Sequence, residues 1–112
     1  MDTFDFNKDK EILIYGYGKV GQGLHRRLVE QGYRVDGIID KNAEQLAPVD
    51  NCVVIKPEEL DAESAHHIII LTLQNILEHE RVVKMLAAKG AEKIIYLKRS
   101  RPETNHVYFN NY

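Results

Sequence analysis

The chain has 112 residues, the length of one domain, and its 44% hydrophobic content suits an ordinary globular core. A formal net charge of −2, without a long run of either sign or a basic strip interleaved with aromatics, argues against nucleic-acid binding and against attraction to acidic lipid. No stretch reaches the roughly 18 apolar residues of a membrane span, the start lacks a signal-peptide pattern, and the lone Cys52 suits a reducing compartment, so we expect a cytoplasmic protein.

Apolar runs alternate with helical patterns along the chain, an arrangement typical of βαβ units and a parallel sheet. The first strand is predicted at residues 12–15. Val20, Leu24 and Leu28 then recur at i, i+4 and i+8, which places them on one face of a helix that ends before Gly32. This region therefore predicts a strand, a tight turn and an amphipathic helix.

Two further strands are predicted with short helical turns after them. The second strand is expected at residues 33–40, and Asn42 is expected to cap a turn of helix behind it. Residues 52–55 form a short third strand. Residues 57–60 predict a single helical turn, with proline at its first position.

The last predicted unit is a strand, a helix and a strand. The fourth strand is expected at residues 67–73, and its run at 68–71 is apolar on both faces, as a central parallel strand must be. A helix at residues 76–89 ends before Gly90, and residues 94–97 form the fifth strand.

These elements predict an α/β fold with three layers and a parallel sheet of about five strands. Right-handed crossovers favour the strand order 3-2-1-4-5. Residues 1–98 make up this single domain. Residues 99–112 are polar with three aromatics, and the sequence leaves open whether they are a disordered tail or an arm that docks on a partner.

The chemistry is expected at the loop Gly16-Tyr17-Gly18-Lys19-Val20-Gly21, a G-x-G-x-x-G motif between a predicted strand and a predicted helix. Gly16 permits the tight turn, Gly18 lets a pyrophosphate approach the backbone, and Gly21 lets the helix pack close to the sheet. The N-terminus of the helix offers unpaired N–H groups to phosphates, which Lys19 also favours. The alternative is that the glycines only form a tight turn with nothing bound.

Asp40 follows Gly21 by 19 positions, at the end of the second predicted strand. A carboxylate there accepts hydrogen bonds from ribose hydroxyls and repels a 2′-phosphate, so we expect NAD to be favoured over NADP. Lys41 follows directly and weakens that preference. The alternative for Asp40 alone is a turn or capping aspartate.

Gln74 and Asn75 follow the fourth predicted strand and are expected at the same sheet edge. They are candidates for hydrogen bonds to a ribose or base. A plain cap for the last helix is the equal alternative.

Other signals do not support a catalytic or metal site. Tyr15 and Lys19 have the Y-x-x-x-K spacing of some dehydrogenases, but that pair lies on a helix, which this one does not. We find no nucleophile elbow and no nucleophile–base arrangement. The histidines show no metal-ligand spacing on a common helix face and are each expected at the surface or an edge: His25, His66, His67, His79 and His106.

Residues 12–40 resemble the start of many NAD-binding Rossmann domains. The segments 52–60 (Cys-Val-Val-Ile-Lys-Pro-Glu-Glu-Leu) and 67–97 are similar to the N-terminal nucleotide-binding domains of nucleotide-sugar and polysaccharide-biosynthesis proteins. Those domains bind NAD or a nucleotide-sugar, and catalysis usually lies in further segments that have no counterpart here. The resemblance implies a binding module without complete catalytic machinery, which works with a separate catalytic domain. The five short strands offer no second wall over a nicotinamide, and the tail after Lys98 of a second subunit could supply one, so we also expect a homodimer.

A second resemblance is to the nucleotide-binding domain of Trk-type potassium-transport regulators. Residues 14–21 and 39–41 match it, whereas Lys56-Pro57 stands where that family usually has Gly-Asp. It implies a regulator that changes shape or assembly when a nucleotide binds.

Overall fold

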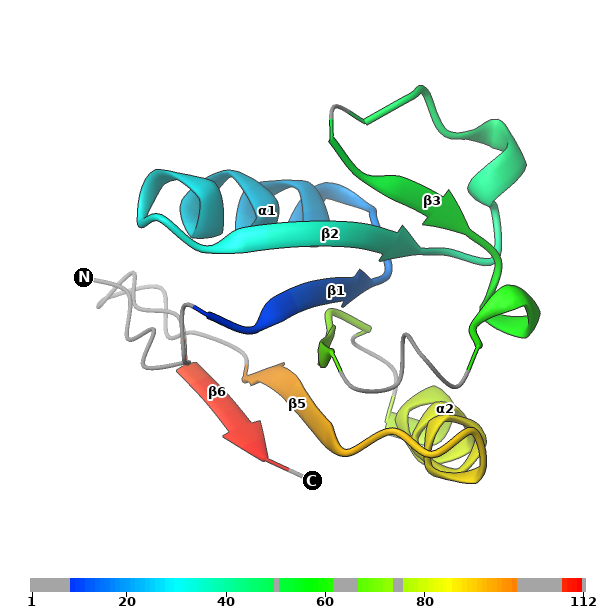
Figure 1. The fold of residues 1–112 in the computed structure, drawn as a ribbon. Coiled ribbons are helices and arrows are strands. Elements are labelled where there is room, and N and C mark those ends of the chain that lie inside the picture. The colour runs from blue at the N-terminus through cyan, green and yellow to red at the C-terminus, as the bar shows by residue number, and fades with distance from the viewer. Residues whose placement is uncertain (1–8, 50, 62–66, 74–75, 99–107, 112) are drawn as a thin grey trace.

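The computed structural model describes residues 9–49, 51–61, 67–73, 76–98 and 108–111. The strands are β1 (Glu11–Tyr15), β2 (Arg34–Ile39), β3 (Val53–Ile55), β4 (Ile68–Leu71), β5 (Lys93–Lys98) and β6 (Tyr108–Asn111), and the helices are α1 (Lys19–Glu30) and α2 (Ile76–Ala88). They form one sheet in the order β3-β2-β1-β4-β5-β6, in which the first five strands are parallel (Figure 1). The predicted order 3-2-1-4-5 is confirmed.

The strand β6 was not predicted. It pairs antiparallel with β5, from Lys98 opposite Tyr108 to Ile95 opposite Asn111. It lies in the segment that we expected to be a polar tail or docking arm, and it extends the sheet at one edge. No helix in the described part of the chain is long and apolar enough to cross a membrane.

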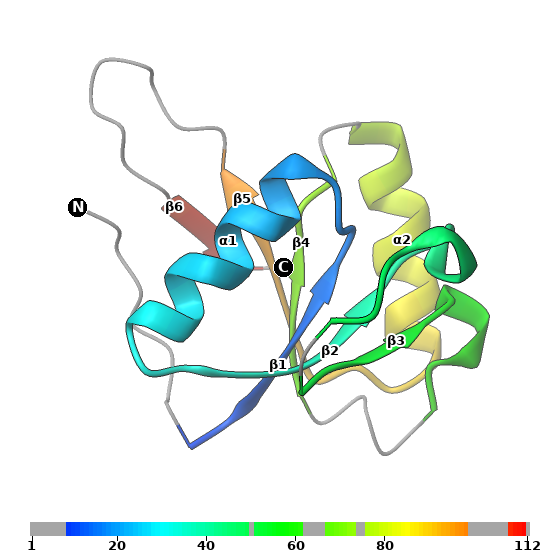
Figure 2. The same ribbon diagram turned by 90° about the horizontal axis from the view of Figure 1, so that it is seen from above.

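The helices cover opposite faces of the sheet and make the three layers of the fold (Figure 2). Because side chains alternate along a strand, Ile12 and Ile14 of β1 pack on the α1 side with Leu24 and Leu28, whereas Leu13 packs on the α2 side. Strand β4 is buried at every position. Burying each such side chain contributes roughly 1.5–3 kcal/mol, so the two apolar clusters fix both helices.

The buried face of α1 differs from the predicted stripe at its first position. Leu24 and Leu28 are buried, but Val20 is 42% exposed, and Gly21 takes the buried place instead. The helix approaches the sheet through a glycine, so Val20 faces outward at the start of the helix.

The strand β2 carries an irregularity at Asp36. Val35 pairs with Ile12 and Gly37 pairs with Leu13, so Asp36 has no partner in β1. As a result Val35 and Ile38, three positions apart, pack on the same face of the sheet. An extra residue of this kind re-aims its side chain away from the regular alternation.

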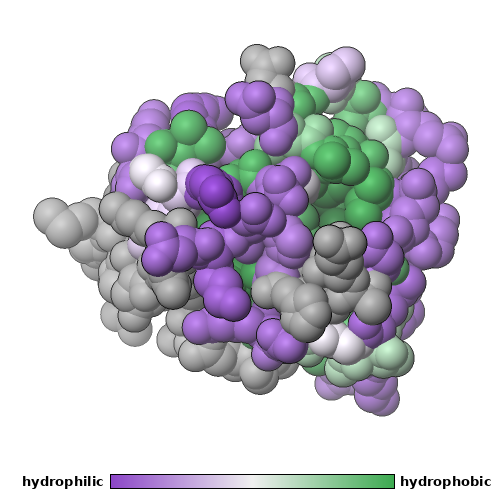
Figure 3. Space-filling model, viewed as in Figure 1, coloured by the Kyte–Doolittle hydropathy of each residue, from purple (hydrophilic) through white to green (hydrophobic). Residues whose placement is uncertain are grey.

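The edge strand β3 leaves apolar surface exposed. Figure 3 shows hydrophobic residues gathered where β3 lies in Figure 1, amid a mostly hydrophilic surface. Val53 of β3 is 63% exposed.

Candidate functional site

A cleft of about 450 Å³ lies at the carboxyl ends of β1, β2 and β4. This volume is within the roughly 300–1,000 Å³ that small-molecule sites occupy. The cleft is lined by the predicted residues Gly16, Tyr17, Gly18, Lys19, Val20, Gly21, Asp40 and Lys41. Gln74 and Asn75 lie outside the described residues. Sequence reasoning thus placed the loop and the acid at one site.

Gly16 and Gly21 are required by the protein's own packing. Gly16 has a φ of +98°, and a Cβ there would lie 2.6 Å from the hydroxyl of Thr72. A Cβ on Gly21 would lie 2.1 Å from the carbonyl oxygen of Gly16. Real Cβ atoms do not approach so closely, so larger residues at either position would displace the loop or the helix.

Thr72, which sequence reasoning missed, fastens the loop to β4. Its Oγ1 lies 3.0 Å from the carbonyl oxygen of Tyr15 and 2.8 Å from that of Gly16, so its one hydrogen is shared between these two acceptors. The backbone N–H of Thr72 also donates to Tyr15 at 3.0 Å. The available signal was its position directly after the most apolar strand, which is next to β1 in the predicted order.

Gly18 differs from the other two glycines because none of the described residues occupies the space beside it. It precedes α1 with φ −78° and ψ −160°, a conformation open to any residue, and a Cβ there would meet no atom within 4 Å. No side chain caps the N-terminus of α1, and its first turn holds no acidic residue. The first N–H groups of a helix have no partner within the helix, so this end offers donors and partial positive charge to the cleft.

Asp40 joins the loop to the end of β2. Its Oδ2 accepts from the backbone N–H of Tyr17 at 2.8 Å, and its Oδ1 accepts from the N–H of Asn42 at 2.7 Å. A carboxylate has about four acceptor positions, so Asp40 retains capacity for another donor. The predicted capping by Asn42 is wrong: its side chain makes no cap bond to the turn at Ala43–Gln45, because Asp40 orders this turn instead.

The Tyr17 side chain is oriented by His25 of α1. The Tyr17 hydroxyl lies 2.7 Å from Nδ1 of His25, and the two rings are 5.8 Å apart. Burial raises the pKa of Tyr17 and lowers the pKa of His25. Beyond His25, the Sγ of Cys52 lies 3.9 Å from its Nε2 and donates to the carbonyl of Val35 at 3.3 Å. Cys52 is partly buried, and burial raises the pKa of its thiol.

The helix α2 adds charged residues that sequence reasoning did not assign to the site. Arg81 and Glu78 line the cleft, with Nη2 of Arg81 3.4 Å from Oε1 of Glu78. The Arg81 side chain is 68% exposed, so it is accessible to a ligand. Burial raises the pKa of Tyr15, and Arg81 partly opposes that shift. The cleft is therefore flanked by cations from α1 and α2 and by the carboxylate of Asp40.

No family model matches the sequence, and no curated protein matches it. Solved structures share its fold. The Rex-family repressor RSP matches with a TM-score of 0.65 and 21% identity, over 76% of this chain and 43% of that one. RSP in complex with β-NADH matches with a TM-score of 0.66 and 19% identity, over 82% of this chain and 47% of that one.

A third structure, UDP-D-quinovosamine 4-dehydrogenase from Vibrio fischeri, matches with a TM-score of 0.67 and 16% identity, over 90% of this chain and 93% of that one. The chain thus spans less than half of the RSP chains and nearly all of the dehydrogenase chain. At these identities the likenesses establish the fold, a Rossmann-type α/β domain.

Proposed function

We propose that this chain binds a dinucleotide of the NAD type in the cleft at the carboxyl edge of the sheet. Gly18 carries the proposal. No described residue would contact a Cβ at this position, yet Gly18 lines the cleft at the N-terminus of α1. A glycine at this place lets a pyrophosphate approach the backbone N–H groups.

The charges around the loop fit the phosphates and a ribose of such a ligand. Lys19 and Arg81 flank the place where the phosphates would lie, and both line the cleft. Asp40, ordered by two backbone N–H groups, would accept from the ribose hydroxyls. The same carboxylate would repel a 2′-phosphate, which favours NAD over NADP, while Lys41 opposes that preference. Gln74 and Asn75 remain proposed contacts.

We assign the module to sugar-nucleotide metabolism, as a binding domain that works with a partner subunit or a catalytic domain. The likeness to a structure named as a UDP-sugar dehydrogenase, over nearly the whole of both chains, supports this role. The alternative is a sensor whose assembly changes when the nucleotide binds. Its support is the likeness to a repressor that was solved with NADH.

The decisive experiment is calorimetric titration of the purified chain with NAD, NADH, NADP and a UDP-sugar, repeated on Gly18→Val and Gly23→Val. Gly23 is a matched control because it lies in α1, has open space beside it and does not line the cleft. We expect Gly18→Val to weaken dinucleotide binding at least tenfold with little change in melting temperature. Gly23→Val should bind as the unchanged protein does.

Equal affinity in Gly18→Val and the unchanged protein would contradict the proposal. The role is decided by two further readouts. Tighter binding of the UDP-sugar than of NAD would favour a nucleotide-sugar site. A change in molar mass by light scattering on addition of NADH, but not NAD, would favour the sensor.

A further inference from the structure

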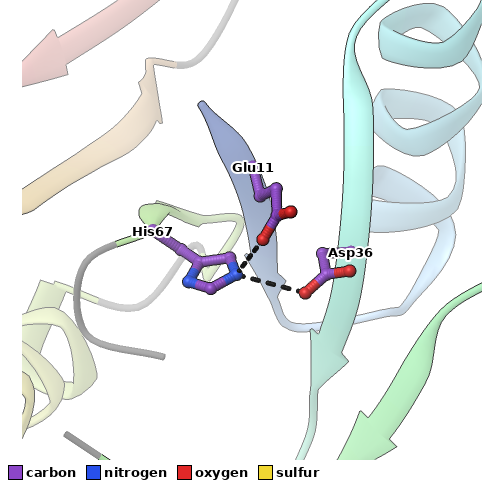
Figure 4. Close-up of side chains that lie close together, drawn as sticks. All are labelled: Glu11, Asp36 and His67. Atoms are coloured by element: carbon purple, nitrogen blue, oxygen red, sulfur yellow. Dashed lines mark hydrogen bonds and ion pairs between the residues drawn. The ribbon is translucent and has the colours of Figure 1, made fainter. Parts of the chain in front are cut away.

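Three ionisable side chains meet at the other end of the sheet from the cleft. Glu11 begins β1, Asp36 lies in β2, and His67 directly precedes β4, so the three come from neighbouring strands (Figure 4). In a parallel sheet these are amino-terminal positions, whereas the glycine loop leaves the carboxyl end of β1. This cluster is therefore separate from the proposed nucleotide site.

The extra residue in β2 is what brings Asp36 into the cluster. Because the register between β1 and β2 shifts there, Asp36 lies outside the regular pairing and its carboxylate reaches across β1 toward His67. Such irregularities often aim a side chain at a functional position.

Both carboxylates converge on the same atom, the Nε2 of His67. Glu11 Oε2 lies 2.7 Å from it and Asp36 Oδ2 lies 3.1 Å from it. A ring nitrogen carries at most one hydrogen, so it cannot give each carboxylate a bond of its own. The single hydrogen of that nitrogen would be shared between the two carboxylates, whereas a metal ion would contact all three ligand atoms at once.

The ligand set matches a first-row divalent metal ion. The three ligand atoms all lie within 4.8 Å of one another. In a tetrahedral zinc site, bonds of about 2.0–2.1 Å place neighbouring ligand atoms about 3.3 Å apart, so small side-chain movements would admit the ion. One imidazole with two carboxylates suits Zn²⁺ or Mn²⁺, while Mg²⁺ prefers oxygen ligands alone.

The surroundings support the ligands and leave room for water. Arg34 Nη2 holds the other oxygen of Glu11 at 3.0 Å, the kind of contact that orients a ligating carboxylate. His67 is 15% exposed in its side chain, and Asp36 is 51% exposed, so an ion can enter from solvent. Glu11 and Asp36 also line a cavity of about 590 Å³, which can supply water as a fourth ligand. We propose that Glu11, Asp36 and His67 form a binding site for a divalent transition-metal ion, with Zn²⁺ as the probe, that joins β1, β2 and β4 at this end of the sheet.

The test uses the untagged chain after chelator treatment, titrated with ZnCl₂, MnCl₂ and MgCl₂ in a calorimeter and melted with and without Zn²⁺. We expect one equivalent of Zn²⁺ to bind and to raise the melting temperature by several degrees, because an ion that binds only the folded state stabilises it. Asp36→Asn and Glu11→Gln keep side-chain size and should each weaken Zn²⁺ binding at least tenfold. Glu30→Gln, an exposed carboxylate of α1, is the control and should bind as the unchanged protein does.

Zn²⁺ binding that is equal in the unchanged protein, Asp36→Asn and Glu11→Gln would overturn the proposal, since the ion would then sit elsewhere. Absence of binding in the unchanged protein would also overturn it. Neither result bears on Gly18, so failure here and failure of the nucleotide proposal are distinguishable.

Discussion

Asp40 has two roles, one in the order of the glycine loop and one in the cleft, and a substitution of Asp40 affects both. It orders the loop through the N–H groups of Tyr17 and Asn42, and its remaining acceptor positions face the cleft. Lys41, its neighbour, is exposed at the same cleft. The balance of these two charges is what decides between NAD and NADP in the proposed site.

We expect Asp40→Asn to lower NAD affinity about tenfold and NADP affinity less, so that the gap between them narrows. A hydrogen bond to a charged group contributes about 1.5–3 kcal/mol, and tenfold corresponds to about 1.4 kcal/mol. Asparagine keeps the size of the side chain and one oxygen to accept from the loop. Titration of both dinucleotides checks this.

Lys41→Ala is the reciprocal control for that experiment. It removes the cation that follows Asp40 in the described lining of the cleft and that would attract a 2′-phosphate, so the preference for NAD should grow. Tighter binding of NADP than of NAD by the unchanged protein would mean that Lys41 dominates the site, and the role assigned to Asp40 would be wrong.

At the scale of elements, α1 and the glycine loop are linked through the Tyr17–His25 contact. Burial lowers the pKa of His25 below its ordinary value of 6.5, so the folded protein favours the neutral ring. The unfolded chain binds a proton more readily near and below that value. The stabilisation by neutral His25 is therefore present above the unfolded pKa and is lost as the pH falls through the folded pKa.

The stability of His25→Gln should consequently depend less on pH than that of the unchanged protein. We expect the unchanged protein to lose more melting temperature between about pH 7 and pH 5 than His25→Gln does. The ring also faces the Tyr17 hydroxyl and the Cys52 thiol, neither of which titrates in that window. If the melting temperatures of the two proteins fall by the same amount between these pH values, this account of His25 is wrong.

The elements that could be predicted from the sequence are those whose structure is determined by residues close together in the chain. The glycine loop was predicted because its turn, its close approach and the following helix are set within about a dozen consecutive residues. The apolar runs likewise predicted β1 to β5 with boundaries within one or two residues of the structure; the largest difference is at β4, which ends at Leu71 rather than at residue 73.

Other features depend on partners that are distant in the chain. An edge strand such as β6 needs no apolar run on both faces, so its sequence did not signal it. The extra residue at Asp36 depends on the register between β1 and β2. Thr72 and Arg81 reach the cleft because β4 and α2 pack beside the loop, and no spacing in the sequence encodes that.

At the scale of the whole molecule, the two ends of the sheet have different surroundings. The carboxyl end holds a cleft with an uncapped helix N-terminus and cations from both helices, which suits an anionic ligand. The amino end holds two carboxylates converging on a histidine, which suits a cation. The strands β1, β2 and β4 run between these ends, so a ligand at one end is separated from the other end by the length of β1.

This arrangement leads us to expect that the isolated chain binds a dinucleotide without turning over substrate. Hydride transfer needs the reacting carbon held beside the nicotinamide and a proton donor or acceptor next to it. The hydrogen-bonded pair of ionisable side chains in the described lining, Arg81 with Glu78, cannot shuttle a proton because an arginine stays protonated. The Tyr17 hydroxyl is directed to His25, which does not line the cleft.

The measurement is the absorbance of the nicotinamide ring during incubation with NAD or NADH and a panel of UDP-sugars and small hydroxy and keto acids. The dinucleotide is present at a concentration that saturates the protein. We expect no change above the rate of a Gly18→Val control. Turnover on the order of 1 s⁻¹, the low end for ordinary enzymes, would make the chain a compact oxidoreductase. If turnover appears only after a second protein is added, that protein completes the substrate site, as the binding-module proposal expects.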